Sequence, residues 1–497
     1  MTDPEKQTDR RLHFSFLLFT IFFVAAMFLP RVVTKGMFGD GLLYASMARN
    51  LAEGNGSWWA PFFSNGYWTD VVKPAYYENP PLMLWIQSVF FRVLGEHWWV
   101  EKGYSFLLLL FNCFLIFRIW QIQFGVADQR RQLAWMPVFF FYLFPSVIWG
   151  SPNNLMDSTM LAICLQAVFC VGNALIRERG AGWYSLLAVL FIFLGLLTKG
   201  PVALYPLAVP FLFALTVRPE QRMRGFGYSL FLGGIVLLMF TGLLAAFPEA
   251  RHFFQNYREQ RLSIALTGGR EDGVNTGWKR LSIFMILGQE LLPVVIATIL
   301  LWGAARWKKW PVSVERNDRL LALFYTLAGC CATLPLLAST RQAGMYLISG
   351  LPMFALAAGY FNAPLVLRLF SLPAAVKEKI AKRLTIFSLA ALLVALMYTG
   401  IRAGKPGREP ALQRDIAEIQ KIMPAGETIA VCEVVMRDFM IHTYLQRFHH
   451  IELSRDQQNT RFFATDVRCD PAAQPGLAGS GFSRIVFKGE VLTVYGR

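Results

Sequence analysis

The sequence has few charged residues: Asp, Glu, Lys and Arg make up 16% of its 497 residues, whereas 55% are hydrophobic and 15% aromatic. This composition excludes an ordinary soluble enzyme. The GxGxxG and GxxxxGKS/T loops that bind nucleotide phosphates are missing, as is the GxSxG turn of serine hydrolases. The seven cysteines include no metal-type CxxC pair. No nucleotide cofactor is therefore expected.

Apolar runs near membrane-spanning length recur from Phe14 to Ile401. The net charge of +16 does not predict nucleic-acid binding, because the Lys and Arg residues lie in short clusters between these runs. Such clusters mark cytoplasmic loops. They predict a mainly α, polytopic transmembrane bundle of about eleven spans, at 14–30, 103–122, 133–149, 155–176, 183–198, 201–217, 226–247, 282–304, 318–338, 345–362 and 384–401. Residues 1–13 are expected to be a cytoplasmic N-terminus, and 14–402 the membrane domain.

The apolar piece 82–94 is too short to span a membrane at about 1.5 Å per residue. We interpret it as an interfacial helix in the first outer loop, 31–102, which is rich in tryptophan. This choice sets the direction of every later span. It places a second long loop, 248–280, on the same outer face, together with a set of charged residues: Asp40, Glu78, Asp157, Lys199 and Arg341.

The last part of the chain, 405–497, regains the composition of a globular protein. Its periodicity predicts helices at 411–423 and 436–448, a strand at 427–435 and a hairpin at 483–496. We expect a small extracytoplasmic α/β domain, in which Cys432 and Cys469 could pair. Its histidines, which have no acidic partner at ligand spacing, are interpreted as surface residues: His442, His449 and His450.

The outer acids and cations suit the transfer of a group from a lipid phosphate. Asp40 could accept the proton of an acceptor hydroxyl, while cations hold the departing phosphate. The candidate cations are Lys199, Arg270 and Arg341. Two structural alternatives remain open. Asp40 could simply cap the helix that begins GLLYASMARN, and the cations could be headgroup-facing anchors.

Five motifs occur in order: GDGLLYASMARNLAEG (39–54), YYENPPLMLW (76–85), NNLMDSTMLAICL (153–165), LLTKGPVALYPLAVP (196–210) and MYLISGLPMFALAAG (345–359). This ordered set resembles the GT-C glycosyltransferases related to protein O-mannosyltransferases and to the aminoarabinose transferase of lipid A. The resemblance covers roughly residues 10–400. It implies inverting transfer of a sugar from a polyprenyl phosphate on the non-cytoplasmic face of a bacterial inner (plasma) membrane.

By motif position, Asp40 is similar to the catalytic acid of the family and Asp157 to its second acid. Glu78 and Glu259 are similar to residues that imply contact with a divalent metal. Two positions depart from the family pattern, since Gly41 follows Asp40 and Asn79 follows Glu78. The acceptor could be lipid A, another envelope glycan or a secreted protein.

A flippase for lipids or lipid-linked sugars is the alternative function, since it would share the many spans and basic loops. It would require charged residues inside the spans to line a path, and these are scarce. An anchored receptor is a further option, but an anchor has little use for eleven spans. Transferase is therefore the favoured interpretation.

Overall fold

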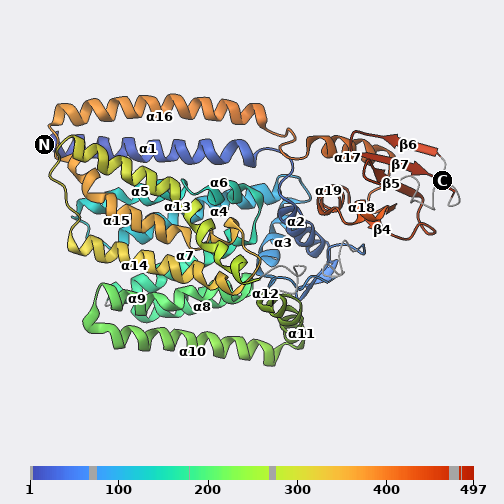
Figure 1. Cartoon of the computed structure of the whole chain (residues 1–497), viewed down its shortest axis with the longest axis horizontal. Helices are drawn as coiled ribbons and strands as arrows, with labels where there is room; N and C mark the ends of the chain where they lie inside the picture. Colours follow the sequence, from blue (N-terminus) through green and yellow to red (C-terminus); the bar gives the residue numbers. More distant parts are fainter. Residues whose placement is uncertain (1–3, 67–74, 178, 268–275, 470–480, 483) are drawn as a thin grey trace.

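The computed structural model describes residues 4–66, 75–177, 179–267, 276–469, 481–482 and 484–497. Long helices run side by side, and a small domain lies beyond one end of this bundle (Figure 1). The chain starts at the opposite end, and the C-terminus lies in the small domain. The predicted fold class, a helical membrane bundle with a small C-terminal α/β domain, is confirmed.

Nine helical stretches in the described residues are long and apolar enough to cross a membrane, or ten if one bent pair counts as a span. Eight of them are centred on single helices: α1 (Pro4–Val32), α4 (Val100–Ile122), α7 (Met156–Ile176), α10 (Arg222–Ala246), α13 (Thr276–Trp307), α14 (Arg316–Thr333), α15 (Leu351–Phe370) and α16 (Ala374–Arg402). The bent pair combines η1 (Gln129–Ala134) and α5 (Trp135–Phe141) with α6 (Pro145–Gly150) and η2 (Ser151–Asn153), at an angle of 77°.

The ninth stretch joins α8 (Ala181–Lys199), η3 (Gly200–Ala208) and α9 (Val209–Thr216). The chain folds back within it. A Cβ placed on Gly195 would lie 3.1 Å from the Cβ of Ala203, although eight residues of straight helix span about 12 Å. The reversal falls at Gly200, whose φ of 76° suits glycine. The stretch thus contains the two separate runs that the sequence predicts at 183–198 and 201–217.

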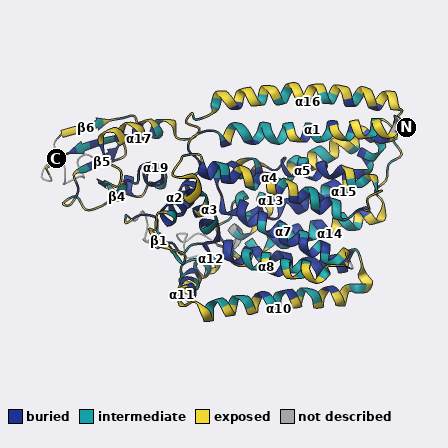
Figure 2. Ribbon diagram, turned by 180° about the vertical axis from the view of Figure 1, so that it is seen from behind, coloured by how far each residue is buried: buried dark blue, intermediate teal, exposed yellow. Residues whose placement is uncertain are grey.

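The interior of the bundle is apolar, and its outer helices are exposed along much of their length (Figure 2). On α10, Leu237 and Leu238 are 61% and 70% exposed, and Val394 on α16 is 65% exposed. Large apolar side chains pointing outward from long helices are what a lipid environment requires. The protein is therefore a multi-pass membrane protein.

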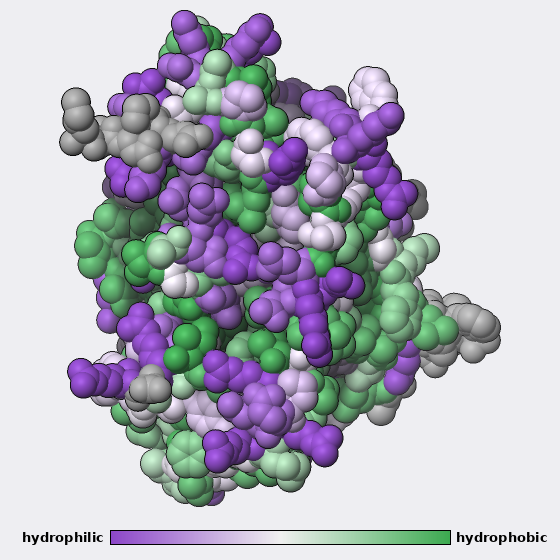
Figure 3. Space-filling view, turned by 90° about the vertical axis from the view of Figure 1, so that its left-hand side faces the viewer, coloured by the Kyte–Doolittle hydropathy of each residue, from purple (hydrophilic) through white to green (hydrophobic). Residues whose placement is uncertain are grey.

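Ionic contacts join the starts of several helices at the end of the bundle where the chain begins. Arg130 bonds Asp318 at 3.1 Å, and Lys377 bonds Asp9 at 2.6 Å. Hydrophilic side chains cover much of this end (Figure 3). α1 begins at Pro4, so the first helix includes most of the segment that the sequence predicts as a separate N-terminus.

Short elements cover the other end of the bundle. They are α2 (Gly39–Ala52), β1 (Gly56–Ser57), β2 (Ala60–Pro61), α3 (Leu82–Leu94), α11 (Pro248–Tyr257), the π-helical η5 (Arg258–Leu262), α12 (Ser263–Thr267), η6 (Leu334–Ala338) and η7 (Gly344–Leu347). The short helix η4 (Pro219–Gln221) connects α9 and α10. The predicted interfacial helix is α3, which has 13 residues and packs beside α2.

The C-terminal domain contains a five-stranded sheet in the order β4 (Glu452–Ser454), β3 (Thr428–Val431), β5 (Phe462–Asp466), β7 (Leu492–Gly496), β6 (Arg484–Lys488). β3 runs parallel to β4 and β5, whereas β7 is antiparallel to β5 and β6. The helices are α17 (Pro410–Ile422), α18 (Glu433–Met436) and α19 (Phe439–His449). The predicted strand 427–435 is too long, because α18 takes over after Cys432, which forms a disulfide with Cys469.

Candidate active site

Asp40 lies in the first turn of α2, at the end of the bundle that faces the C-terminal domain. The helix begins at Gly39, and its N-cap residue is Phe38, which makes no side-chain capping bond. Asp40 is therefore not the cap that one interpretation of the sequence requires. Its carboxylate is left for another role, close to the positive end of the helix dipole.

Four other charged residues that the sequence singles out lie around Asp40. Burial raises the pKa of Asp40 from 3.8 to about 6, and the positive charges of Arg341 and Lys199 oppose this rise. The negative charges of Glu78 and Asp157 add to it. These residues come from α2, the loop before α3, α7, α8 and the loop between η6 and η7. The site is thus assembled from five segments of the chain.

Lys199 and Asp157 form an ion pair at the centre of this cluster. The side chain of Asp157 is 5% exposed and that of Lys199 14% exposed. The ammonium of Lys199 also lies 4.9 Å from the centre of the Tyr346 ring. Lys199 is the last residue of α8 and directly precedes the turn at Gly200. The turn therefore determines the position of the Lys199 backbone and the direction of its side chain. The TKGP motif is thus both a chain reversal and a source of charge.

Close backbone packing places α2 against η2, the short helix just before α7. A Cβ on Gly41 would lie 2.1 Å from the carbonyl oxygen of Asn153, so this position has no room for a side chain. The Asn154 amide donates to the Gly41 carbonyl at 2.9 Å, and Gln87 of α3 donates to Asn154 at 2.7 Å. This contact explains why glycine, and not a second acid, follows Asp40.

Sequence reasoning missed Arg261, whose guanidinium bonds the Glu78 carboxylate at 3.3 Å. Arg261 comes from η5, a π-helical turn, and such turns are frequent at functional sites. Glu78, and after it Tyr346, Tyr76 and Tyr44, lie near enough to raise the pKa of Arg261. The sequence could have indicated two of these tyrosines as site residues. Tyr44 stands four residues after Asp40 on the same helix face, and Tyr76 begins the motif YYENPP. Nothing in the sequence distinguished Arg261 from its neighbouring arginines.

Other predicted residues are placed differently. Glu259 is 65% exposed and pairs with Arg258 at 3.3 Å. Arg341 is exposed on its loop, although near enough to lower the pKa of Asp40. Arg270 lies outside the described residues.

A groove of about 380 Å³ opens next to Gly200, the neighbour of Lys199. Its walls are largely apolar and come from the end of α8, from α10 and from α11. Phe240, Leu244 and Phe254 line it, together with Arg251 and Arg258. An apolar groove with two guanidinium groups suits a long hydrocarbon chain that ends in an anion.

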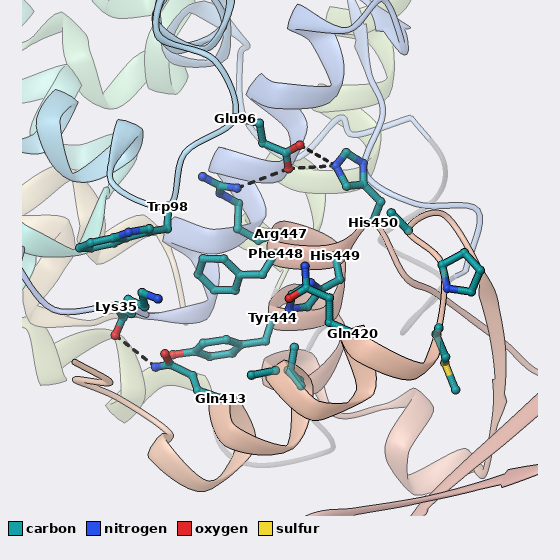
Figure 4. Close-up of a pocket in the computed structure, with 15 residues that line it drawn as sticks. Lys35, Glu96, Trp98, Gln413, Gln420, Tyr444, Arg447, Phe448, His449 and His450 are labelled. Atoms are coloured by element: carbon teal, nitrogen blue, oxygen red, sulfur yellow. Dashed lines mark hydrogen bonds and ion pairs between the residues drawn. The ribbon is translucent and has the colours of Figure 1, made fainter. Parts of the chain in front are cut away.

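A second acidic group, between the membrane bundle and the C-terminal domain, could hold a metal. Ligand atoms of Glu53, Glu96 and His450 all lie within 4.8 Å of one another. Figure 4 shows His450 and Arg447 directed at Glu96, beside a pocket of about 690 Å³. The carboxylates are already paired, because Arg49 bonds Glu96 at 3.0 Å and lies 3.7 Å from Glu53.

The histidines of the C-terminal domain differ from the prediction. His442 and His449 are 1% and 9% exposed, so they are core residues, and burial lowers the pKa of each to about 4. His450 has an acidic partner after all, Glu96 at 2.9 Å. That partner comes from a segment more than 350 residues away, which spacing could not reveal.

α19 of the C-terminal domain packs against α2, the helix that carries Asp40. Arg447 bonds Glu101 of α4 at 2.7 Å, and both side chains are almost fully buried. In the other direction, Arg49 of α2 donates to the carbonyls of Gln446 and Arg447 at the end of α19. The C-terminal domain thus forms part of the support for α2.

Comparisons with known proteins agree with this architecture. Residues 78–245 match the family described as dolichyl-phosphate-mannose-protein mannosyltransferase. The structure of ArnT from Cupriavidus metallidurans bound to undecaprenyl phosphate aligns over 96% of this chain and 97% of that chain, with a TM-score of 0.63 and 12% identity. The chain has an ArnT-like fold. Its resemblance to the GT-C glycosyltransferases is thereby confirmed.

ArnT in the apo state gives a TM-score of 0.62 at 15% identity, again over 96% of this chain and 97% of that chain. An oligosaccharyltransferase from Archaeoglobus fulgidus, solved with Zn and sulfate, gives 0.50 at 12% identity over 90% of this chain and 68% of that chain. No curated protein sequence matches significantly. The family match includes Glu78, Asp157 and Lys199 of the ArnT-like chain, whereas Asp40, Arg261 and Arg341 lie outside it. Together, the family match and the fold agree with the resemblance to the GT-C glycosyltransferases.

Proposed function

We propose that this protein transfers a sugar from a polyprenyl-phosphate donor to a hydroxyl group of an envelope lipid, glycan or protein. The observation that carries the proposal is the half-buried Asp40, with its pKa near 6, in one cluster with Lys199 and Arg341. A carboxylate with such a pKa is mostly ionised at neutral pH and is a stronger base than an exposed aspartate. The similar ArnT from Cupriavidus metallidurans was solved with undecaprenyl phosphate bound.

In the proposed reaction, Asp40 accepts the proton of the acceptor hydroxyl, from which it must lie about 2.6–3.2 Å away in the complex. The acceptor oxygen attacks the anomeric carbon from the side opposite the phosphate. The bond between that carbon and the phosphate oxygen breaks, and polyprenyl phosphate leaves with the electron pair. The anomeric configuration inverts.

The cations of the cluster suit the leaving phosphate. Lys199 and Arg341 would stabilise its growing negative charge, as positioned cations do in transfer reactions. Asp157 would orient the ammonium of Lys199 through their ion pair. The groove beside Gly200 would take the first isoprene units of the donor. Asp157 is on this view a positioning residue.

A metal ion at Glu78 has weaker support. The guanidinium of Arg261 bonds this carboxylate at 3.3 Å and already balances its negative charge. The same argument applies to Glu53 and Glu96, which contact Arg49. We therefore assign the neutralisation of charge in the proposed mechanism to side chains alone.

We propose the inner membrane of a bacterium as the location, with the active site and C-terminal domain outside the cytoplasm. The disulfide between Cys432 and Cys469 supports this orientation, since disulfides persist in oxidising compartments. The Lys and Arg clusters at the other end, which include Arg130 and Lys377, support it as well.

The flippase alternative has less support. Within α13, the buried Glu290 accepts hydrogen bonds from the backbone and hydroxyl of Ser146 at 2.9 and 2.6 Å. Glu290 therefore accepts the hydrogen bond of a backbone amide at the start of α6, so its charge has a structural role. It does not line an open path for a substrate.

The test is release of polyprenyl phosphate by the purified protein in lipid nanodiscs, with a panel of polyprenyl-phosphate sugars and an envelope extract as acceptor. Asp40→Asn should lower turnover by at least about 10²-fold, the lower range for a general base. Glu249→Gln, on the exposed first turn of α11, serves as the control. Normal turnover by a folded Asp40→Asn protein would refute the role of Asp40. Transport of the donor without release would favour the flippase.

A further inference from the structure

A groove of about 730 Å³ runs between α1 and α16, on the edge of the bundle opposite α10 (Figure 1). Its walls are mostly apolar and include Phe22 and Ala26 of α1 and Ala391 and Val394 of α16. Arg31 and Arg402, at the last turns of the two helices, complete the lining. The groove therefore combines an apolar channel with a pair of positive charges at one end.

The groove lies where small side chains line both helices, next to a stretch in which larger side chains of the two helices are in contact. Before the groove, the Ser15 hydroxyl donates to the Ala381 carbonyl at 3.1 Å, and the Phe19 and Phe22 rings contact Phe387. Further along, alanines of both helices face the gap, among them Ala26, Ala391 and Ala395. Alanine side chains are too short to fill the gap between the two backbones.

Beyond the groove, the segments that follow α1 and α16 meet again. The Gly404 amide donates to the Val33 carbonyl at 2.9 Å, and the Lys35 amide donates to the Lys405 carbonyl at 2.9 Å. These contacts close the groove at both of its ends along the helix axes. Its side remains open to the surrounding lipid.

Its length fits one leaflet. From Phe22 to Arg31 the helix rises about 14 Å, and from Ala391 to Arg402 about 16 Å. Half of a hydrocarbon core is about 15 Å thick. An acyl chain can therefore fill the groove from its closed inner end to the level of the two arginines, where lipid phosphates lie.

The arginines lack acidic partners. Arg31 donates one bond to the Met27 carbonyl of its own helix, and neither Arg31 nor Arg402 pairs with a carboxylate in the part of the chain that the structure describes. Two guanidinium groups at the level of the lipid headgroups attract a phosphate strongly, because their donors can bind its oxygens in pairs.

We propose that this groove is a binding site for an anionic glycerophospholipid of the leaflet next to the C-terminal domain. One acyl chain lies between α1 and α16, and the phosphate contacts Arg31 and Arg402. The site is distinct from the donor groove beside Gly200, which lies on α10 and α11. A lipid bound here also braces the junction at Val33 and Gly404, from which the Asp40 segment and the C-terminal domain both begin.

Native mass spectrometry of the full-length protein tests this proposal, with phosphatidylglycerol and phosphatidylcholine of identical acyl chains as probes. The wild-type protein should retain one phosphatidylglycerol in preference to phosphatidylcholine. Arg31→Ala and Arg402→Ala should each lower this preference about fivefold, the contribution of one basic residue at an anionic membrane surface. Lys382→Ala/Arg383→Ala, at the exposed start of the same helix α16, should retain it.

A second variant tests whether the acyl chain binds between α1 and α16. Ala26→Phe/Ala395→Phe keeps both arginines and fills the groove, so it should lose the bound lipid while the electrostatic attraction remains. A preference that persists in either the arginine or the phenylalanine variant would overturn the site. Displacement of phosphatidylglycerol by an equimolar polyprenyl phosphate would overturn the assignment to a glycerophospholipid.

Discussion

Lys199, the last residue of α8, pairs with Asp157 in the first turn of α7, and both side chains are mostly buried. The pair joins two helices that cross the bundle in opposite directions and places a cation next to Asp40. Breaking a buried pair from one side leaves an uncompensated charge.

Substitutions of this pair should therefore be strongly coupled. Asp157→Asn and Lys199→Met should each lower the melting temperature and raise the KM for the donor. The double variant should lose less stability than the sum of the two, with a coupling of about 0.5–3 kcal/mol, as for residues in contact. Thermal melting and donor titration measure this cycle. Additive losses would show that the contact does not contribute.

The rate should depend on the ionisation of Asp40. Its pKa is raised to about 6 by burial, so the carboxylate is protonated below pH 6 and cannot accept the hydroxyl proton. We expect kcat/KM to fall about tenfold per pH unit below this value and to level off above it. A pH profile between 4.5 and 8 measures this, and circular dichroism over the same range serves as the folding control. A flat profile would contradict the assignment of Asp40 as base.

Gly41→Ala should reduce turnover although it leaves Asp40 in place. The added Cβ would meet the Asn153 carbonyl at 2.1 Å, so α2 must shift away from η2. A displacement of about 1 Å at a reacting group can lower a rate by about 10²-fold. Gly182→Ala, where no heavy atom lies within 4 Å, is the matched control. Equal turnover of the two variants would show that α2 tolerates the shift.

Arg261→Gln should lower turnover, whereas removal of divalent metal ions by a chelator should not. The guanidinium of Arg261 balances Glu78, and its removal leaves a negative charge near Asp40. We expect treatment with EDTA to leave the rate of the wild-type protein unchanged. A rate that falls with EDTA and recovers with a divalent cation would instead assign Glu78 to a metal.

The buried pair of Arg447 and Glu101 should be essential for docking of the C-terminal domain. Arg447→Leu leaves Glu101 buried without its partner and should cost about 3–5 kcal/mol of stability. Arg414→Leu removes an exposed pair with Glu490 and should cost about 0–1 kcal/mol. Limited proteolysis and thermal melting compare the two. Similar behaviour would mean that the domain docks without this pair.

Hydropathy predicted most of the apolar segments that the structure forms as long helices. The runs at 183–198 and 201–217 were separated because Gly200 and Pro201 interrupt the apolar pattern, and the structure reverses there. The shortness of 82–94 excluded it as a span, and α3 has this length. Each of these inferences depends only on the composition of one segment, which can be read without knowing how the segment packs.

The grouping of the charged residues needed the tertiary structure. The sequence placed Asp40, Asp157 and Lys199 on one face of the membrane, and the fold brought Asp157 and Lys199 into contact. It could not select Arg261, because several arginines share its loop and only the turn of η5 points this one to Glu78. It also missed the contact between His450 and Glu96, whose partners come from distant segments. Hydropathy is a property of each segment and is readable in the chain, whereas side-chain pairing depends on how separate segments pack.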